Sequence, residues 1–247
     1  MKLTVYMALH KKIEKIPFDY IIPIQVGAAL TDEKLTHLND KTGINISEKN
    51  RQFCELTALY WMWKNTNNNY LGLCHYRRFF NMPQEKEILK TLQNDMIILP
   101  KRIFFKKTVY EQYKDCHGTQ EWDIMVDTLK SMYPDYLKPA ESVFSANSII
   151  PYNMFIACKK WVKDYCSWLF PILFCINQRM EAINPSKERY IGFLAERLLT
   201  VYVIKNDFKI QEIEIINSNQ KIIKQSHLGK AVRTVFFKLR SYQKGRK

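Results

Sequence analysis

The chain alternates short apolar segments rich in β-forming residues with longer segments whose apolar residues recur at helical spacing. The first kind predicts strands at 2–9, 70–76, 95–99, 154–158 and 209–216, with a further short apolar piece at 20–23. The second kind predicts helices at 47–64, 85–92, 161–180 and 189–205, and pieces of helix within 108–146. We expect breaks near Pro134 and Pro139, and an interruption or kink near Pro171. Strands that alternate with helices are typical of a layered α/β fold.

The composition limits the class of protein. Of the 247 residues, 47% are hydrophobic and 25% charged, which suits one folded domain with a sizeable core. We expect this domain at 1–216 and a separate tail at 217–247. The longest apolar run, 168–176, is far shorter than the roughly 20 residues that a membrane span needs. The six cysteines form no C-x-x-C pair and follow no secretory signal, so we expect a cytoplasmic protein.

The strongest local signal is the sequence His75-Tyr76-Arg77-Arg78, which ends an apolar strand. In open α/β sheets ligands bind beyond the carboxyl ends of the strands, and the planar fork of arginine suits phosphate. If the strand continued, His75 and Arg77 would share one face and Tyr76 and Arg78 the other. The segment therefore predicts an anion site, or else a strand end whose arginines form salt bridges with nearby helices.

Two further segments offer candidate site residues. In 45–50 a helix begins, and Ser47, Lys49 and Asn50 add donors to its free N–H groups, which could hold a diphosphate or a nucleoside. Plain helix capping by Ser47 also explains that residue. Glu196 and Arg197 lie in an otherwise apolar helix, so the carboxylate is either a general base or half of a structural ion pair with Arg189 or Arg197.

Several motifs are absent from the sequence. There is no glycine-rich phosphate loop and no D-x-D, the usual ligand of a metal-bound diphosphate. The two E-x-E pairs, Glu85/Glu87 and Glu212/Glu214, read as solvated faces. No His/Cys spacing suits zinc, and no nucleophile elbow occurs. We therefore expect no divalent metal, and cations of the protein would stabilise any bound diphosphate.

The C-terminal segment 228–247 carries seven of the excess positive charges and no acid, against a net charge of +14. Its apolar residues step by three and four, with lysines and arginines between them. This pattern predicts a basic amphipathic helix on an anionic membrane surface. A helix packed on its own domain, or a solvated basic end, are the alternatives.

A series of blocks, in order along 2–216, resembles a bacterial family once described only as a domain of unknown function and found in capsular and exopolysaccharide loci. The blocks are His10-Lys11, P-I-Q-V-G-A (23–28), N-I-S-E-K-N followed by C-E-L-T-A-L-Y-W-x-W-K-N (45–65), Y-L-G-L-C-H-Y-R-R-F (70–79), I-I-L-P (97–100), T-V-Y-E-Q-Y (108–113), P-Y-N-M-F-I (151–156) and G-F-L-A-E-R-L-L (192–199).

The resemblance implies a GT-A-like glycosyltransferase sandwich with a mixed central sheet, whose first half binds the nucleotide. It implies transfer of a hexose, galactose or galactofuranose, from a UDP-sugar to a growing, lipid-linked surface glycan. The protein would then work at the inner face of the cell membrane, held there by 228–247.

The resemblance also implies roles by position in the blocks. The residues at the nucleotide would be His10, Gln25, Val26, Gly27, Asn45, Ser47, Lys49 and Asn50. The place of D-x-D would be taken by His75, Tyr76, Arg77 and Arg78. The residues near the sugar or acceptor would be Asn153, Met154, Phe155, Glu196 and Arg197.

Glycosyl transfer needs positive charge at the leaving diphosphate, for which Arg77 and Arg78 are the candidates. An inverting enzyme also needs a base, with Glu196 first and His75 second, whereas a retaining enzyme does not. Two other classes stay open. A nucleic-acid-binding module would explain the charge and the aromatic residues, although half of the charge excess lies in the tail. A non-catalytic scaffold at the membrane is the other.

Overall fold

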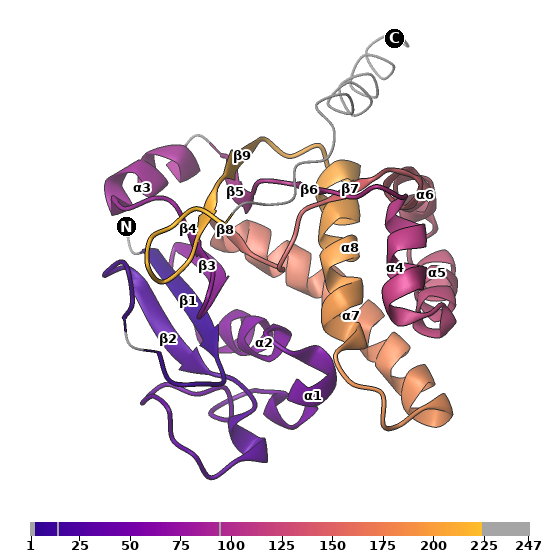
Figure 1. Cartoon of the computed structure of the whole chain (residues 1–247), viewed down its shortest axis with the longest axis horizontal. Coiled ribbons are helices and arrows are strands. Elements are labelled where there is room, and N and C mark those ends of the chain that lie inside the picture. The colour runs from indigo at the N-terminus through magenta and orange to yellow at the C-terminus, as the bar shows by residue number, and fades with distance from the viewer. Residues whose placement is uncertain (1–2, 14, 94, 224–247) are drawn as a thin grey trace, which may run out of the picture.

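The computed structural model describes residues 3–13, 15–93 and 95–223. A mixed six-stranded sheet in the order β2-β1-β3-β8-β5-β9 forms its centre (Figure 1). Its strands are β1 (Leu3–Leu9), β2 (Ile21–Gln25), β3 (Tyr70–His75), β5 (Ile97–Pro100), β8 (Phe155–Cys158) and β9 (Ile210–Ile213). All neighbours are parallel except β8, which is antiparallel to both β3 and β5. This confirms the expected α/β fold with a mixed central sheet.

Two small antiparallel sheets flank the main one. The pairs are β4 (Phe79–Phe80) with β10 (Ile215–Ile216), and β6 (Ile103–Phe104) with β7 (Ser148–Ile149). The prediction of one strand over 209–216 was therefore wrong, because the chain passes from the main sheet to the β4 sheet at Glu214. The Glu214 carbonyl accepts a hydrogen bond from the Asn81 amide, 2.9 Å away, which aligns β10 with β4.

Eight α-helices and three short 3₁₀ helices lie within the described residues. The α-helices are α1 (Asn50–Phe53), α2 (Leu56–Asn65), α3 (Glu85–Gln93), α4 (Val109–His117), α5 (Gln120–Met132), α6 (Leu137–Ser145), α7 (Lys159–Ile183) and α8 (Tyr190–Lys205). The 3₁₀ helices are η1 (Ala28–Leu30), η2 (Ser47–Lys49) and η3 (Pro134–Tyr136). Within this part of the chain no helix has the length and apolar content needed to cross a bilayer. The expected C-terminal helix at 228–247 lies outside the described residues.

The predicted helix 47–64 is divided into η2, α1 and α2, and the chain breaks between α1 and α2 at Cys54, whose φ is +51°. Ser47 does not cap a helix. Its hydroxyl instead donates to Asp40 Oδ1 at 2.5 Å. The expected break at Pro139 is absent, since this residue lies in the first turn of α6, where a missing N–H costs nothing. Helix α7 also runs uninterrupted through Pro171.

Apolar side chains fill both faces of the main sheet, because strand residues alternate between them. On β1, Tyr6 and Ala8 belong to the larger core, which α2, α5, α7 and α8 cover. Val5 and Met7 belong to the smaller core, which α3, β4 and β10 cover. Figure 1 shows α3 on one side of the sheet, with α7 and α8 on the other. The sheet is thus sandwiched, and its edges are the places left for polar chemistry.

A substitution at Gly72 in β3 would test how tightly this sheet is packed. A Cβ at Gly72 would lie 2.9 Å from the Phe155 carbonyl oxygen and 3.1 Å from Val5 Cγ2. Backbone cannot move aside as a flexible side chain can, so we expect Gly72→Ala to lower the free energy of unfolding by about 1–3 kcal/mol. Chemical denaturation measures it.

The matched control is Gly192→Ala in α8, where the nearest atoms to an added Cβ lie at 3.4 Å. Alanine is favoured over glycine inside a helix by about 1 kcal/mol, so this variant should be as stable as the parent or more so. Equal stability of the two variants would contradict the close packing at Gly72.

Candidate functional site

The candidate site lies at the edge of the main sheet where β1 and β3 end and the antiparallel strand β8 begins. His10 follows β1, His75 is the last residue of β3, and Asn153 lies two residues before the start of β8. The sheet topology therefore brings together three segments that are distant in sequence. This is the edge at which open α/β sheets bind ligands.

The segment 75–78 is a tight turn and not a continuing strand. The amide of His75 donates to the Arg78 carbonyl at 3.3 Å, and the amide of Arg78 donates to the His75 carbonyl at 3.1 Å. The predicted alternation of faces along these four residues was therefore wrong. The turn also explains why Tyr76 can donate its amide to the Ala8 carbonyl at 3.2 Å, which ties the turn to β1.

Aromatic rings hold the cations of this turn in place. Arg77 Cζ lies 5.0 Å from the centroid of the Tyr76 ring, and Arg78 Cζ lies 4.3 Å from that of Tyr152. The His10 ring meets Tyr76 edge-on at 5.1 Å. Arg77 is exposed, so its guanidinium is open to a ligand.

The pKa of His10 is lowered, chiefly by burial and then by the charges of Lys11, Arg77 and Arg189. A neutral imidazole beside cations fits a site that receives an anion. Arg189, whose role sequence reasoning missed, has φ +64° just before α8 and reaches this edge from the far end of the chain.

His75 and Asn153 converge on a carboxylate that sequence reasoning missed, Glu55, between α1 and α2. Asn153 Nδ2 donates to Glu55 Oε1 at 2.7 Å and to the Gly192 carbonyl at 3.0 Å. His75 Nε2 lies 2.7 Å from the Tyr152 carbonyl oxygen and 3.9 Å from Glu55 Oε1. Because a carbonyl only accepts, Nε2 carries the hydrogen, and a neutral His75 has its lone pair on Nδ1.

Tyr152 and Asn153 have positive φ angles, +72° and +52°. This conformation is uncommon for residues other than glycine and persists where surrounding contacts impose it. Here the Tyr152 amide donates to Glu196 Oε1 at 3.0 Å, while its carbonyl accepts from His75. The pair of strained residues thus joins α8 to β3.

Glu196 is the acid of the site whose pKa is raised, and both of its oxygens accept hydrogen bonds. Its Oε1 accepts from the Tyr152 amide, and its Oε2 accepts from Arg197 Nη1 at 2.9 Å. The side chain is 20% exposed. Burial raises the pKa of this carboxyl, Arg197 opposes the shift, and Glu55 adds to it. The structural ion pair with Arg197 is therefore present, and the environment also favours a carboxyl that can exchange a proton.

Arg197 lies behind Glu196 and is buried. Its guanidinium donates to the Phe193 carbonyl at 3.0 Å and to Gln112 Oε1 at 2.7 Å, and stands 5.1 Å from the Tyr113 ring centroid. These contacts orient Glu196. Gln112 also lines a cavity of about 420 Å³ between α4 and the segment after β6, with Phe104, Phe105, Lys106, Lys107, Asp115 and Cys116.

The segment 25–50, which the resemblance assigns to nucleotide binding, forms a loop in which several polar side chains bond to the loop's own backbone. Buried Gln25 donates to the Glu33 carbonyl at 2.7 Å and accepts from the Leu35 amide at 2.9 Å. Asn45 bonds the Lys41 and Gly43 carbonyls and the Ser47 amide. These side chains shape the loop. Val26 is buried beside them.

Buried Asp40, which has no motif around it, organises the same loop. It accepts from the amides of Gly27 at 2.9 Å and Ala28 at 3.1 Å as well as from Ser47. Gly27, at φ +65°, leaves no room for a Cβ beside Asn50 Oδ1, 2.7 Å away.

The remaining candidates are placed as follows. Asn50 Nδ2 donates to the Cys54 carbonyl at 2.7 Å, and Lys49 Nζ lies 3.6 Å from Glu181 Oε1. Met154 and Phe155 are fully buried on opposite faces of the sheet, in the smaller and larger core, so neither side chain reaches the surface. Among the described residues no group of three or more His, Cys, Asp and Glu could hold a metal ion.

The described residues form an α/β protein with a polar, cationic cluster at the carboxyl edge of its mixed sheet. The solved apo structure of the bifunctional glycosyltransferase WbbM is similar, with a TM-score of 0.80 and 26% identity. The likeness covers 94% of this chain and 48% of WbbM, so the chain spans about half of that protein's length. The chain belongs to the family described as domain of unknown function (DUF4422), whose model matches residues 4–207. None of the curated proteins matches it.

The raised pKa of Glu196 has a consequence for stability. The protonated carboxyl is favoured in the folded chain, so its contribution is fully present below the unfolded pKa and is lost as the pH rises through the folded pKa. We expect Glu196→Gln to lose this dependence. Urea unfolding over acid to neutral pH should show the stability of the variant rising relative to the parent. A difference that does not change with pH would contradict the shift.

Proposed function

We propose that the protein is a glycosyltransferase that moves a hexose from a UDP-linked donor to a growing, lipid-linked surface glycan, with galactose or galactofuranose as the sugar. Family membership and the likeness to WbbM support transfer of a glycosyl group. One observation carries the proposal for this chain. Glu196, whose pKa is raised, and exposed cations lie at the same edge of the sheet.

The cations would serve the leaving diphosphate. As the glycosidic bond to the donor breaks, negative charge gathers on the diphosphate, and prearranged cations stabilise it. Arg77 is exposed and held by Tyr76, and both Arg77 and Arg189 lie within electrostatic reach of His10. The proposal assigns this task to protein side chains and places no metal there.

Glu196 would remove the proton from the acceptor hydroxyl in an inverting reaction. Its two hydrogen bonds, to the Tyr152 amide and to Arg197, fix the carboxylate, and burial makes it a stronger base than an exposed glutamate. His75 is the second candidate through Nδ1. A retaining reaction would use neither as a base.

We assign the acceptor to the cavity of about 420 Å³ lined by Gln112, whose Oε1 accepts a hydrogen bond from Arg197. A lipid-linked acceptor places the reaction at the inner face of the membrane. We assign the attachment to the basic segment 228–247, which lies outside the described residues.

Binding of the donor is tested by thermal unfolding with UDP, GDP, CMP and UDP-sugars, with Mn²⁺ or with EDTA. A ligand at about 100 times its Kd adds about 2.7 kcal/mol of stability. We expect a shift with UDP and UDP-galactose or UDP-galactofuranose that survives EDTA and weakens at least tenfold in affinity in Arg77→Gln. Arg179→Gln, which removes an exposed arginine paired with Asp127, is the control.

The absence of any nucleotide shift would reject the proposed donor. Tight, strongly salt-dependent binding of random oligonucleotides in its place would favour a nucleic-acid-binding protein.

Turnover tests the base. Glu196→Gln keeps the size of the side chain but cannot take a proton, so we expect kcat to fall about 10²–10⁴-fold with little change in donor affinity. Initial rates with a saturating acceptor measure it. His75→Gln is the comparison, and a larger loss there than in Glu196→Gln would transfer the role to His75.

A further inference from the structure

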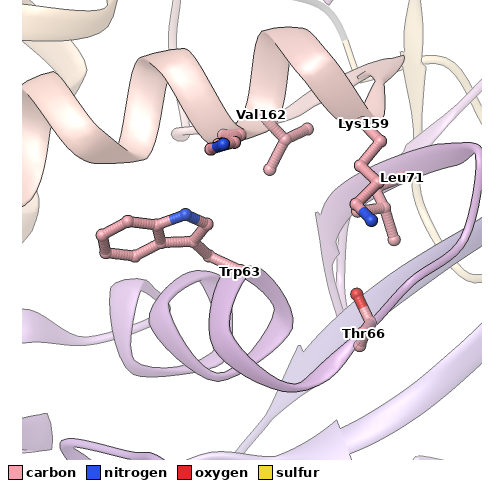
Figure 2. A pocket seen from close by; sticks show the side chains of 6 residues that line it. Trp63, Thr66, Leu71, Lys159 and Val162 are labelled. Carbon is pink, nitrogen blue, oxygen red and sulfur yellow. The ribbon is translucent and has the colours of Figure 1, made fainter.

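A second cavity lies at the end of β3 opposite to the candidate site. It encloses about 290 Å³ and is lined by Trp63, Thr66, Leu71, Lys159, Val162 and Lys163. Figure 2 shows the indole of Trp63, the side chain of Val162, the Lys159 amine and the Thr66 hydroxyl around one open space. The lining comes from α2, β3 and the start of α7, so three rigid elements shape it.

The polar lining of this cavity consists mainly of donors. The indole N–H of Trp63 and the ammonium groups of Lys159 and Lys163 can only donate. Lys64 adds a further cation, with Nζ 3.5 Å from the centroid of the Trp63 ring. No carboxylate lines the cavity.

These lysines are not used to build the fold. Within the described part of the chain, Lys64, Lys159 and Lys163 form no salt bridge, and the ammonium of Lys159 bonds only the amide oxygen of Asn67. The acid nearest in sequence, Asp164, pairs with Lys160 at 2.6 Å. The cavity therefore concentrates positive charge that no carboxylate of the described residues balances through a salt bridge.

The position on α7 increases the imbalance. Lys159 begins this helix of 25 residues, whose first turn contains no acid and whose N-cap makes no side-chain hydrogen bond. Cations at the positive end of a helix are unfavourable, whereas an anion there is stabilised. An anion in the cavity would offset the lysines and the helix end together.

We propose that this cavity is a second ligand site, which takes a hexose that carries a phosphate or a carboxylate. The volume is at the lower end of small-molecule pockets, about 300 Å³, and so suits a single sugar unit. Leu71 and Val162 are buried, so the half-buried side chain of Trp63 offers the apolar surface to a sugar. Thr66 Oγ1 spends its hydrogen on the Met62 carbonyl at 2.7 Å and can accept from a sugar hydroxyl.

The site is independent of the reaction proposed at the other end of β3. In β3 the cavity residue Leu71 and the site residue His75 are four residues apart, about 13 Å along a strand. Both ends of the sheet can therefore hold a ligand at once.

Calorimetric titration of the full chain tests the proposal with glucose 6-phosphate and glucuronate, and with glucose and inorganic phosphate as comparisons. We expect saturable binding of the two anionic sugars, and weaker binding of glucose and of phosphate alone. Lys163→Gln should weaken binding about tenfold by removing a charged donor. Trp63→Phe, which keeps the ring but removes the indole N–H, should also weaken it.

Lys160→Gln is the matched control, because this lysine lies in the same turn but does not line the cavity. Arg77→Gln separates the two ends of the sheet and should leave the binding unchanged. Loss of binding in Arg77→Gln with retention in Lys163→Gln would place the ligand at the other edge and overturn the proposal. So would the absence of binding at millimolar concentration, or glucose or phosphate binding as tightly as the anionic sugars.

Discussion

The hydrogen bond from the Tyr152 amide to Glu196 is the contact on which the candidate site depends. It fixes α8 against a pair of residues with positive φ, and those residues set the start of β8. The carbonyl of Tyr152 accepts a hydrogen bond from His75, and its ring lies against Arg78. Removing the carboxylate would therefore leave a buried amide without an acceptor and release the strained turn that aligns three strands' ends.

Two carboxylates and several cations lie at this edge, and burial shifts the pKa values of Glu196 and His10. Glu55 raises the pKa of Glu196, while Arg197 lowers it, so the acid is held between two opposing charges. Because Arg197 is itself bound to Gln112 and the Phe193 carbonyl, it cannot follow a ligand. The exposed charges of the site are Arg77 and Arg189, which a ligand can reach. A fixed acid beside exposed cations suits a site in which negative charge arrives and departs.

The sequence pattern predicted those strands and helices whose apolar residues repeat regularly along the chain. The strands β1, β3, β5 and β8 and the helices α3 and α8 were predicted within a few residues, because their apolar periodicity runs without interruption. The cluster His75–Arg78 and the pair Glu196–Arg197 were recognisable because charge at a strand end or in an apolar helix is unusual.

Long-range contacts account for what could not be predicted. The break at Cys54 lies inside a continuous helical pattern, and nothing near it in sequence marks it. Glu55 becomes part of the site only because Asn153, 98 positions away, donates to it. Asp40 likewise has no motif, and its role follows from the amides that the fold of the 26–47 loop directs to it.

The distribution of charge separates the groups that stabilise the fold from those available to ligands. Exposed pairs such as Lys107–Asp115 and Lys160–Asp164 are held at 2.6 Å but contribute little in water. Cations without a carboxylate partner in the described chain include Arg77 at one end of β3 and Lys163 at the other. Both side chains are exposed and therefore open to anionic ligands. The same electrostatics that supports a diphosphate at the carboxyl edge therefore supports an anionic ligand at the opposite one.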